Sequence, residues 1–193
     1  AVLYQNDDYG RDYLKGFRDG LGERAKSMIV AEASYEVTDP TVDSPMLSLK
    51  ASGADTFFNI TTAKFAAQSI RKAAEIGWRP QHYLNSVSSG VASVMMPAGP
   101  DNGVGIISAA YIKDPTDPQW AGSPEIEAWQ AWMKRYHPGG DLRDNLNVYA
   151  YSVAQTLVQV LRQCGDRLTR DNVMKQATSL ELSLPMLLPG VMI

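Results

Sequence analysis

The sequence has few of the residues that most metal and nucleophile sites require. Its only cysteine, Cys164, excludes an internal disulfide bond, and it is expected to pack as a small apolar side chain near a helix end. The two histidines, His82 and His137, are far apart in the sequence, and neither lies in a nucleophile or metal-ligand motif. We therefore predict no metal site and no cofactor.

The common enzyme motifs are missing as well. No Gly-x-Gly-x-x-Gly follows the first predicted strand and no P-loop occurs, which argues against binding of dinucleotides or nucleoside triphosphates. No Gly-x-Ser-x-Gly nucleophile elbow is present. An enzyme is therefore not predicted. A small α/β enzyme stays open as an alternative, with Asp7, Asp8 and Tyr9 as its only candidate acid–base groups.

The charge and hydropathy patterns exclude two further classes of partner. The net charge is −3 without a long basic run, so we predict no nucleic-acid partner and no polybasic membrane anchor. No stretch approaches the roughly 20 apolar residues of a membrane span. The sequence opens directly as a strand without an export-signal pattern, so we expect a fragment that lacks its true start and end.

Strand and helix patterns alternate along the first 111 residues. Apolar runs predict strands, and stretches with apolar residues at helical spacing separate most of them. Strands joined by helical crossovers form parallel sheets. The fold class predicted is α/β, an open and mostly parallel sheet flanked by helices in a single lobe over residues 1–193. The strands are expected at residues 1–5, 28–35, 55–60, 81–84 and 104–111, and the helices between them at 11–21, 43–50 and 63–76.

The rest of the chain is predicted to be helical after a proline-containing turn at residues 113–118. A helix is expected at 124–136, where Ile126, Trp129 and Met133 share one face. A longer helix is expected at 145–163, and a short one after the capping residue Thr169. The buried stripe of the longer helix is predicted to contain Leu146, Tyr149, Val153, Leu157 and Val160.

Polar and aromatic residues follow four predicted strands, at the edge where open parallel sheets bind their ligands. Hydroxyl, amide and phenol groups predominate there, which favours a small polar ligand held by neutral hydrogen bonds. The candidate ligand-binding residues are Tyr9, Asp8, Thr61, Thr62, Asn85, Ser86 and Tyr111.

Each candidate also has a purely structural interpretation. Tyr9 could fix the helix start to the sheet, and Asp7 and Asp8 could be solvated helix caps. The two threonines could cap the next helix, and the pair at 85–86 could form a turn. The four tryptophans are expected to pack in the interior.

The order and spacing of several segments resemble one protein family. Residues 2–10 (VLYQNDDYG) and the basic amphipathic helix after them resemble the start of the second lobe of type I periplasmic binding proteins. The branched-chain amino acid receptors (Leu/Ile/Val-binding type) are the most similar branch. The resemblance continues through 49–55 (LKASGAD), 70–77 (IRKAAEIG), 149–151 (YAY) and 154–157 (AQTL).

The resemblance implies a two-lobed clamshell protein of the periplasm that delivers a small molecule to the permease subunits of an ABC importer. It implies no catalysis, and it implies that an N-terminal lobe is missing from this sequence. A ligand-sensing domain of a receptor or of a transcription regulator is the alternative, because the same lobe occurs in those proteins.

The resemblance also bears on the ligand. A tyrosine that the amino-acid receptors use for binding is matched by Tyr9, but a second aromatic contact falls at Thr62 and the acidic partner of the ligand ammonium falls at Ser86. A buried ammonium without a carboxylate partner is unfavourable. We therefore expect a carboxylate-bearing or aromatic acid rather than an aliphatic amino acid.

Overall fold

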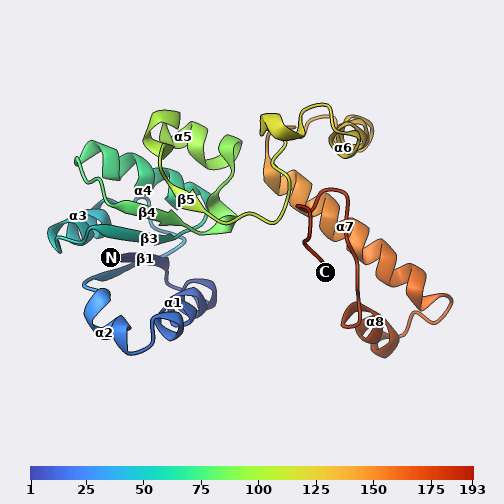
Figure 1. The fold of residues 1–193 in the computed structure, drawn as a ribbon, viewed down its shortest axis with the longest axis horizontal. Helices are drawn as coiled ribbons and strands as arrows, with labels where there is room; N and C mark the ends of the chain where they lie inside the picture. The colour runs from blue at the N-terminus through green and yellow to red at the C-terminus, as the bar shows by residue number, and fades with distance from the viewer. The chain divides into compact units, whose positions relative to one another are not determined.

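A computed structural model describes all residues from 1 to 193 (Figure 1). The contacts within the chain divide it into two compact units, Ala1–Ala109 and Ala110–Ile193, which we call the first and the second unit. Each unit is described by itself. None of the helices is both long and apolar enough to cross a membrane.

The first unit contains a five-stranded sheet in the order β2-β1-β3-β4-β5, and every neighbouring pair of strands is parallel. This confirms the predicted α/β class. The strands are β1 (Val2–Gln5), β2 (Glu32–Tyr35), β3 (Thr56–Ile60), β4 (Gln81–Leu84) and β5 (Ile107–Ser108). The helices are α1 (Asp8–Leu21), α2 (Ala25–Met28), α3 (Asp43–Ala51), α4 (Ala63–Glu75) and α5 (Met96–Ala98), the last preceded by a π-helical turn at Val91–Met95.

Helices lie on both faces of this sheet (Figure 1). On one face, Leu14 of α1 packs against Val2 and Ile60. On the other face, Met46 of α3 belongs to the cluster that also contains Leu3 and Phe57, and Phe65 of α4 joins it. Alternate residues of β1 and β3 therefore point to opposite apolar layers, as expected for a parallel sheet that is covered on both sides.

The second unit is helical, with α6 (Pro124–Tyr136), α7 (Asn145–Cys164) and α8 (Arg170–Ala177). The predicted inward face of α6 is confirmed, because Ile126, Trp129 and Met133 are all buried, in a cluster with Val148 and Met186. Thr169 caps α8 as expected, since its hydroxyl accepts a hydrogen bond from the Asn172 N–H.

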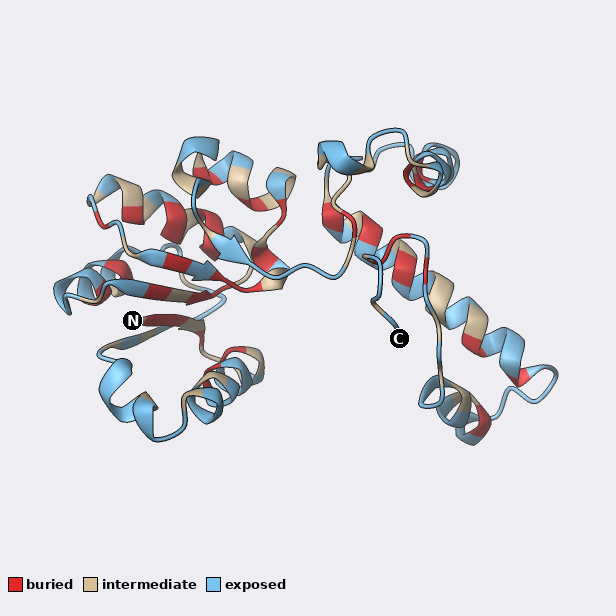
Figure 2. Cartoon of the chain, viewed as in Figure 1, coloured by how far each residue is buried: buried red, intermediate tan, exposed pale blue.

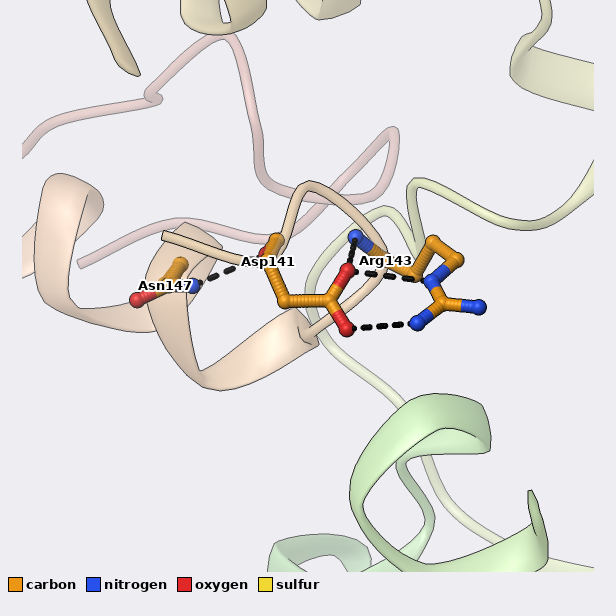
Figure 3. A network of polar contacts seen from close by, with 3 residues as sticks. All are labelled: Asp141, Arg143 and Asn147. Atoms are coloured by element: carbon orange, nitrogen blue, oxygen red, sulfur yellow. Dashed lines mark hydrogen bonds and ion pairs between the residues drawn. The ribbon is translucent and has the colours of Figure 1, made fainter. Parts of the chain in front are cut away.

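A small polar network shapes the turn before α7 (Figure 3). The Arg143 guanidinium pairs with the Asp141 carboxylate at 2.9 Å, and the Arg143 backbone N–H donates to the same group. The Asn147 side chain donates to the Asp141 carbonyl. The hydrogen bonds from Arg143 lower the pKa of Asp141 to about 2. This network connects the turn to the first turn of α7.

The predicted buried stripe of α7 is wrong for four of its five residues. Only Val160 is buried, whereas Leu146, Tyr149, Val153 and Leu157 are between 42% and 52% exposed. The face of α7 that is buried contains Asn145, Val148 and Ser152. In Figure 2, exposed positions alternate with buried ones along the length of this helix.

Two predicted strands are shorter than expected. The strand expected at 104–111 is reduced to Ile107–Ser108, and Gly103 and Gly105 flank a turn where it was expected to begin. The strand expected from residue 28 begins only at Glu32, because Met28 ends α2. Runs of apolar residues alone do not separate a strand from the turn that leads into it.

Candidate functional site

The carboxyl ends of four neighbouring strands form the candidate site of the first unit. β1, β2, β3 and β4 are parallel neighbours, so the segments that follow them emerge at one edge of the sheet. Six of the seven predicted ligand-binding residues follow β1, β3 or β4 there. Tyr111 belongs to the second unit, where its carbonyl accepts a hydrogen bond from the Leu188 N–H.

Gln5, the last residue of β1, connects three of these strand ends. Its side-chain carbonyl oxygen accepts hydrogen bonds from the Tyr35 hydroxyl and the Thr62 hydroxyl, both at 3.0 Å. The Tyr35 hydroxyl in turn accepts a hydrogen bond from the Thr62 N–H at 3.1 Å. Thr62 stands at the N-cap position of α4, but its hydroxyl does not cap the helix. The partly exposed Thr62 is thus fixed in position by the ends of β1 and β2.

Tyr9 lies in the first turn of α1 and is half-buried. Its ring packs edge-to-face against Tyr13, with the ring centroids 5.4 Å apart. Its hydroxyl is buried and makes no hydrogen bond. Burial raises the pKa of Tyr9 above its ordinary value, and Tyr13, Tyr35 and Asp7 raise it further. A buried hydroxyl without a partner is uncommon. The Tyr9 hydroxyl can therefore still form a hydrogen bond, in addition to those of the Gln5–Tyr35–Thr62 network.

The two aspartates after β1 have different roles. Asp7 is the N-cap of α1, where its carboxylate accepts a hydrogen bond from the Gly10 N–H at 3.1 Å. That bond is the largest cause of a lowered pKa of Asp7, and a hydrogen bond from the Gln5 amide lowers the pKa further. Asp8 is exposed in the first turn of the helix. The structural interpretation of Asp7 as a helix cap is therefore correct.

Thr61 and Asn85 are buried and form hydrogen bonds within the protein. The Thr61 hydroxyl donates to the side-chain oxygen of Asn59 at 2.7 Å. The Asn85 amide donates to the Thr61 carbonyl at 2.8 Å, and the Asn85 side-chain oxygen accepts from the Ser88 N–H at 3.0 Å. Both residues hold the ends of β3 and β4 together, and Asn85 also forms the turn that follows.

Ser86 is half-buried directly after Asn85. Its carbonyl accepts a hydrogen bond from the Ser89 hydroxyl at 2.9 Å, whereas its own hydroxyl makes no hydrogen bond within the protein. Together with Tyr9, Ser86 gives this edge of the sheet two hydroxyls without a partner. The Ser86 hydroxyl is not enclosed and can hold a small polar ligand, whereas the Tyr9 hydroxyl is enclosed by the protein.

His82 is buried in β4, and its pKa allows a prediction of how acid affects the stability of the first unit. Burial lowers the pKa of His82 to about 4 from an ordinary value of 6.5. At pH values between about 4 and 6.5, this histidine is protonated more often in the unfolded chain than in the folded protein. Lowering the pH through this range therefore favours unfolding. We expect the free energy of unfolding to fall by about 2 kcal/mol from about pH 7 to about pH 5 because of this group.

Urea unfolding at the two pH values measures this effect. The His82→Gln variant is expected to lose that part of the pH dependence, whereas the exposed His137→Gln variant is expected to retain it. An unchanged pH dependence in His82→Gln would contradict the prediction.

Gln5, Tyr35 and Asn59 organise the site, but they were not among the candidate ligand-binding residues that the sequence predicted. Gln5 and Tyr35 end strands, so the rule that selected the other candidates could have found them. Asn59 lies inside β3 among apolar residues. A polar residue within an apolar strand pattern needs a hydrogen-bond partner, and the sequence could have indicated its role in this way. No group of three or more His, Cys, Asp or Glu side chains is arranged to hold a metal ion.

Comparison with known proteins finds a matching family and similar proteins that cover most of this chain. The model of a family described as periplasmic binding protein matches residues 1–192. The Leu/Ile/Val-binding protein homolog 7 of Brucella abortus is 25% identical over 166 residues, which cover 84% of this chain and 40% of that protein.

Solved structures show the same fold at low sequence identity. A fatty acid ABC transporter substrate-binding protein from Thermomonospora curvata matches 96% of this chain and 46% of its own, with a TM-score of 0.72 and 21% identity. A branched chain amino acid ABC transporter from Thermus thermophilus with bound valine matches 91% of this chain and 45% of its own, with a TM-score of 0.72 and 15% identity. The chain thus spans less than half the length of each of these three proteins.

Proposed function

The chain belongs to the periplasmic binding protein family, and we propose that it is the ligand-binding lobe of an extracytoplasmic solute receptor that serves an ABC importer. One observation carries this proposal. The unpartnered hydroxyls of Tyr9 and Ser86 and the fixed Thr62 follow three strands whose carboxyl ends share one edge of the sheet. Binding without catalysis is the role that these neutral groups support.

In the proposed mechanism, a second lobe closes over this edge when solute is bound. The solute must contact both lobes, because a ligand shifts a conformational equilibrium only through its differential affinity for the two states. Thr62 and Ser86 would contact the solute through their hydroxyls and Tyr9 through the exposed part of its side chain, with Asp8 at the margin. Thr61 and Asn85 would position the two loops, and the closed protein would then dock on the membrane permease.

The exposed stripe of α7 supports the existence of that further lobe. Leu146, Tyr149, Val153 and Leu157 recur at the spacing of one helical face, yet they are exposed in the second unit. The compared proteins are more than twice as long as the part that this chain matches. We propose that the part of the protein beyond this sequence covers the α7 stripe.

For the solute, we propose a small carboxylate-bearing or aromatic acid rather than an aliphatic amino acid. The side chains that follow β3 and β4 are hydroxyls and amides, and none is a carboxylate that could pair with an ammonium. A buried ammonium would lack a charged partner there. The compared proteins include one named for fatty acids and one with bound valine, so the fold accommodates both kinds of solute.

Calorimetric titration of the complete two-lobed protein tests both the proposed receptor role and the proposed class of solute. Aromatic and aliphatic monocarboxylates are expected to bind, and leucine and valine are expected to bind at least about ten-fold more weakly. Tight binding of leucine alone would overturn the solute class, and failure of all these compounds would count against the receptor role. The 193-residue chain by itself is expected to bind weakly, because it supplies one wall of the site.

Introducing a carboxylate provides a matched test. The Ser86→Asp variant is expected to gain affinity for leucine or valine by about ten-fold, because the new charge can pair with the ligand ammonium. The Ser44→Asp variant, at an exposed position in the first turn of α3, is the control and is expected to leave amino-acid affinity unchanged. Equal behaviour of the two variants would mean that Ser86 does not face the solute.

A further inference from the structure

One pocket of the first unit lies at the end of the sheet opposite the candidate site. Its volume is about 290 Å³, and its walls come from the second half of α4, the turn before β4 and the segment before β5. Helices in βαβ units run opposite to the strands, so these three segments meet at the amino ends of the strands. The pocket is therefore separate from the edge that holds Tyr9, Thr62 and Ser86.

The hydrogen bonds of Asn59 determine which nitrogen of His82 carries the proton. The side-chain oxygen of Asn59 accepts from the Thr61 hydroxyl, so its amide nitrogen is the donor in its other contacts. That nitrogen lies 2.8 Å from the Ser69 hydroxyl oxygen and 3.2 Å from His82 Nε2. Because Nε2 accepts this hydrogen bond, the neutral ring carries its hydrogen on Nδ1.

His82 thus provides the pocket with an unused donor. The residue is only 8% exposed and lines the pocket wall, and its Nδ1–H makes no hydrogen bond within the protein. The ring is held in place by Asn59 and by the Phe57 ring, whose centroid is 4.6 Å away. Nδ1 is not among the fully enclosed polar atoms that lack a partner, so it is accessible, and a ligand oxygen can accept a hydrogen bond from this fixed N–H.

The rest of the lining limits the chemistry of such a ligand. Ala73, Trp78 and Ile106 provide apolar surface. The exposed Arg79 and Asp101 add one charge of each sign, so the lining has no net charge while His82 is neutral. The pocket volume is at the small end of ligand sites.

We propose that this pocket is a second small-molecule site of the protein, specific for a carbonyl or carboxylate oxygen next to a short apolar body. The oxygen would accept the hydrogen bond from His82 Nδ1–H, and the apolar body would lie against Trp78 and Ile106. The site does not depend on the proposed transport function, since it uses none of the residues assigned to that role.

Nitrogen NMR of the imidazole rings tests the donor first. The chain has only two histidines, so the His82 signals can be assigned by comparison with the His137→Gln variant. At neutral pH, His82 is expected to show the pattern of a ring protonated on Nδ1. A ring protonated on Nε2 would overturn the proposal.

Titration with three small probes that share an isopropyl group tests the ligand class. Isobutyramide and isobutyrate carry an oxygen acceptor and are expected to shift the His82 Nδ1 signal in a saturable manner. Isobutylamine, which is a donor at neutral pH, is expected to leave that signal unchanged. No saturable shift with either acceptor, or an equal shift with the amine, would overturn the proposal.

A variant that fills the pocket provides the final control. Ala74 lines the pocket, and the Ala74→Leu variant is expected to weaken binding of both acceptors by about ten-fold or more. The Ala51→Leu variant adds the same volume at an exposed position at the end of α3 and is expected to bind as the unmodified protein does. Unchanged binding in Ala74→Leu would place the probes elsewhere and overturn the proposal.

Discussion

Replacement of Gly10 by alanine is expected to lower the free energy of unfolding by about 3 kcal/mol or more. Gly10 lies in the first turn of α1, directly over the end of β1. A Cβ atom at this position would lie 1.9 Å from the Gln5 carbonyl oxygen and 2.8 Å from the Gln5 backbone nitrogen. These are backbone atoms, so the helix start or the strand has to move. The substitution should therefore disturb Tyr9 and the Gln5 network together.

Gly16 offers a matched control in the same helix. A Cβ atom at Gly16 would have no atom within 4 Å, so Gly16→Ala is expected to raise the free energy of unfolding by about 0.5–1 kcal/mol through helix propensity. Urea unfolding, with hydrogen exchange of peptides from α1 and β1, measures both effects. Equal stabilities of the two variants would mean that α1 lies further from β1 than the structure shows.

Replacement of Asn59 by alanine is expected to destabilise the first unit by about 4 kcal/mol, because several buried groups lose a partner at once. The Thr61 hydroxyl loses its acceptor, and His82 Nε2 and the Ser69 oxygen lose their donor. All of these groups are buried, so water cannot replace the amide without a rearrangement. The loops after β3 and β4 should loosen, and the position of Ser86 with them.

Thr61→Val is the control for Asn59→Ala, since it keeps the shape of the side chain and removes one hydrogen bond. It is expected to cost about 1 kcal/mol. Hydrogen exchange of peptides from β3 and β4 and urea unfolding compare the two variants. If Asn59→Ala costs no more than Thr61→Val, the contacts of Asn59 with Ser69 and His82 contribute little to stability.

Much of the fold could be predicted from the sequence because apolar residues at helical or strand spacing are in most cases the residues that are buried in the structure. In α6, Ile126, Trp129 and Met133 recur at helical spacing, and all three are buried. Helix α1 is capped by Asp7, one of the two aspartates that the sequence indicated as caps from their position before the helical pattern. The carboxyl ends of parallel neighbours then meet at one edge by geometry alone.

The α7 stripe shows where this reasoning stops. Leu146, Tyr149 and Val153 have the spacing of a buried face, but the described residues leave them exposed. Periodicity identifies a face that is suited to burial, and it does not show which other element covers that face. The sequence alone could not distinguish packing within the chain from packing against something outside it.

The sequence by itself determined the α/β class, the element order and the strand ends at which polar residues gather. The tertiary structure decided which of those residues have a free polar group. Thr61 and Asn85 form their hydrogen bonds inside the protein, whereas the Tyr9 and Ser86 hydroxyls have no partner. The physical reason is that a residue's position along the chain fixes the strand end to which it belongs. The partners of its polar atoms come from strands and helices distant in the sequence, and only their packing brings them within hydrogen-bond distance.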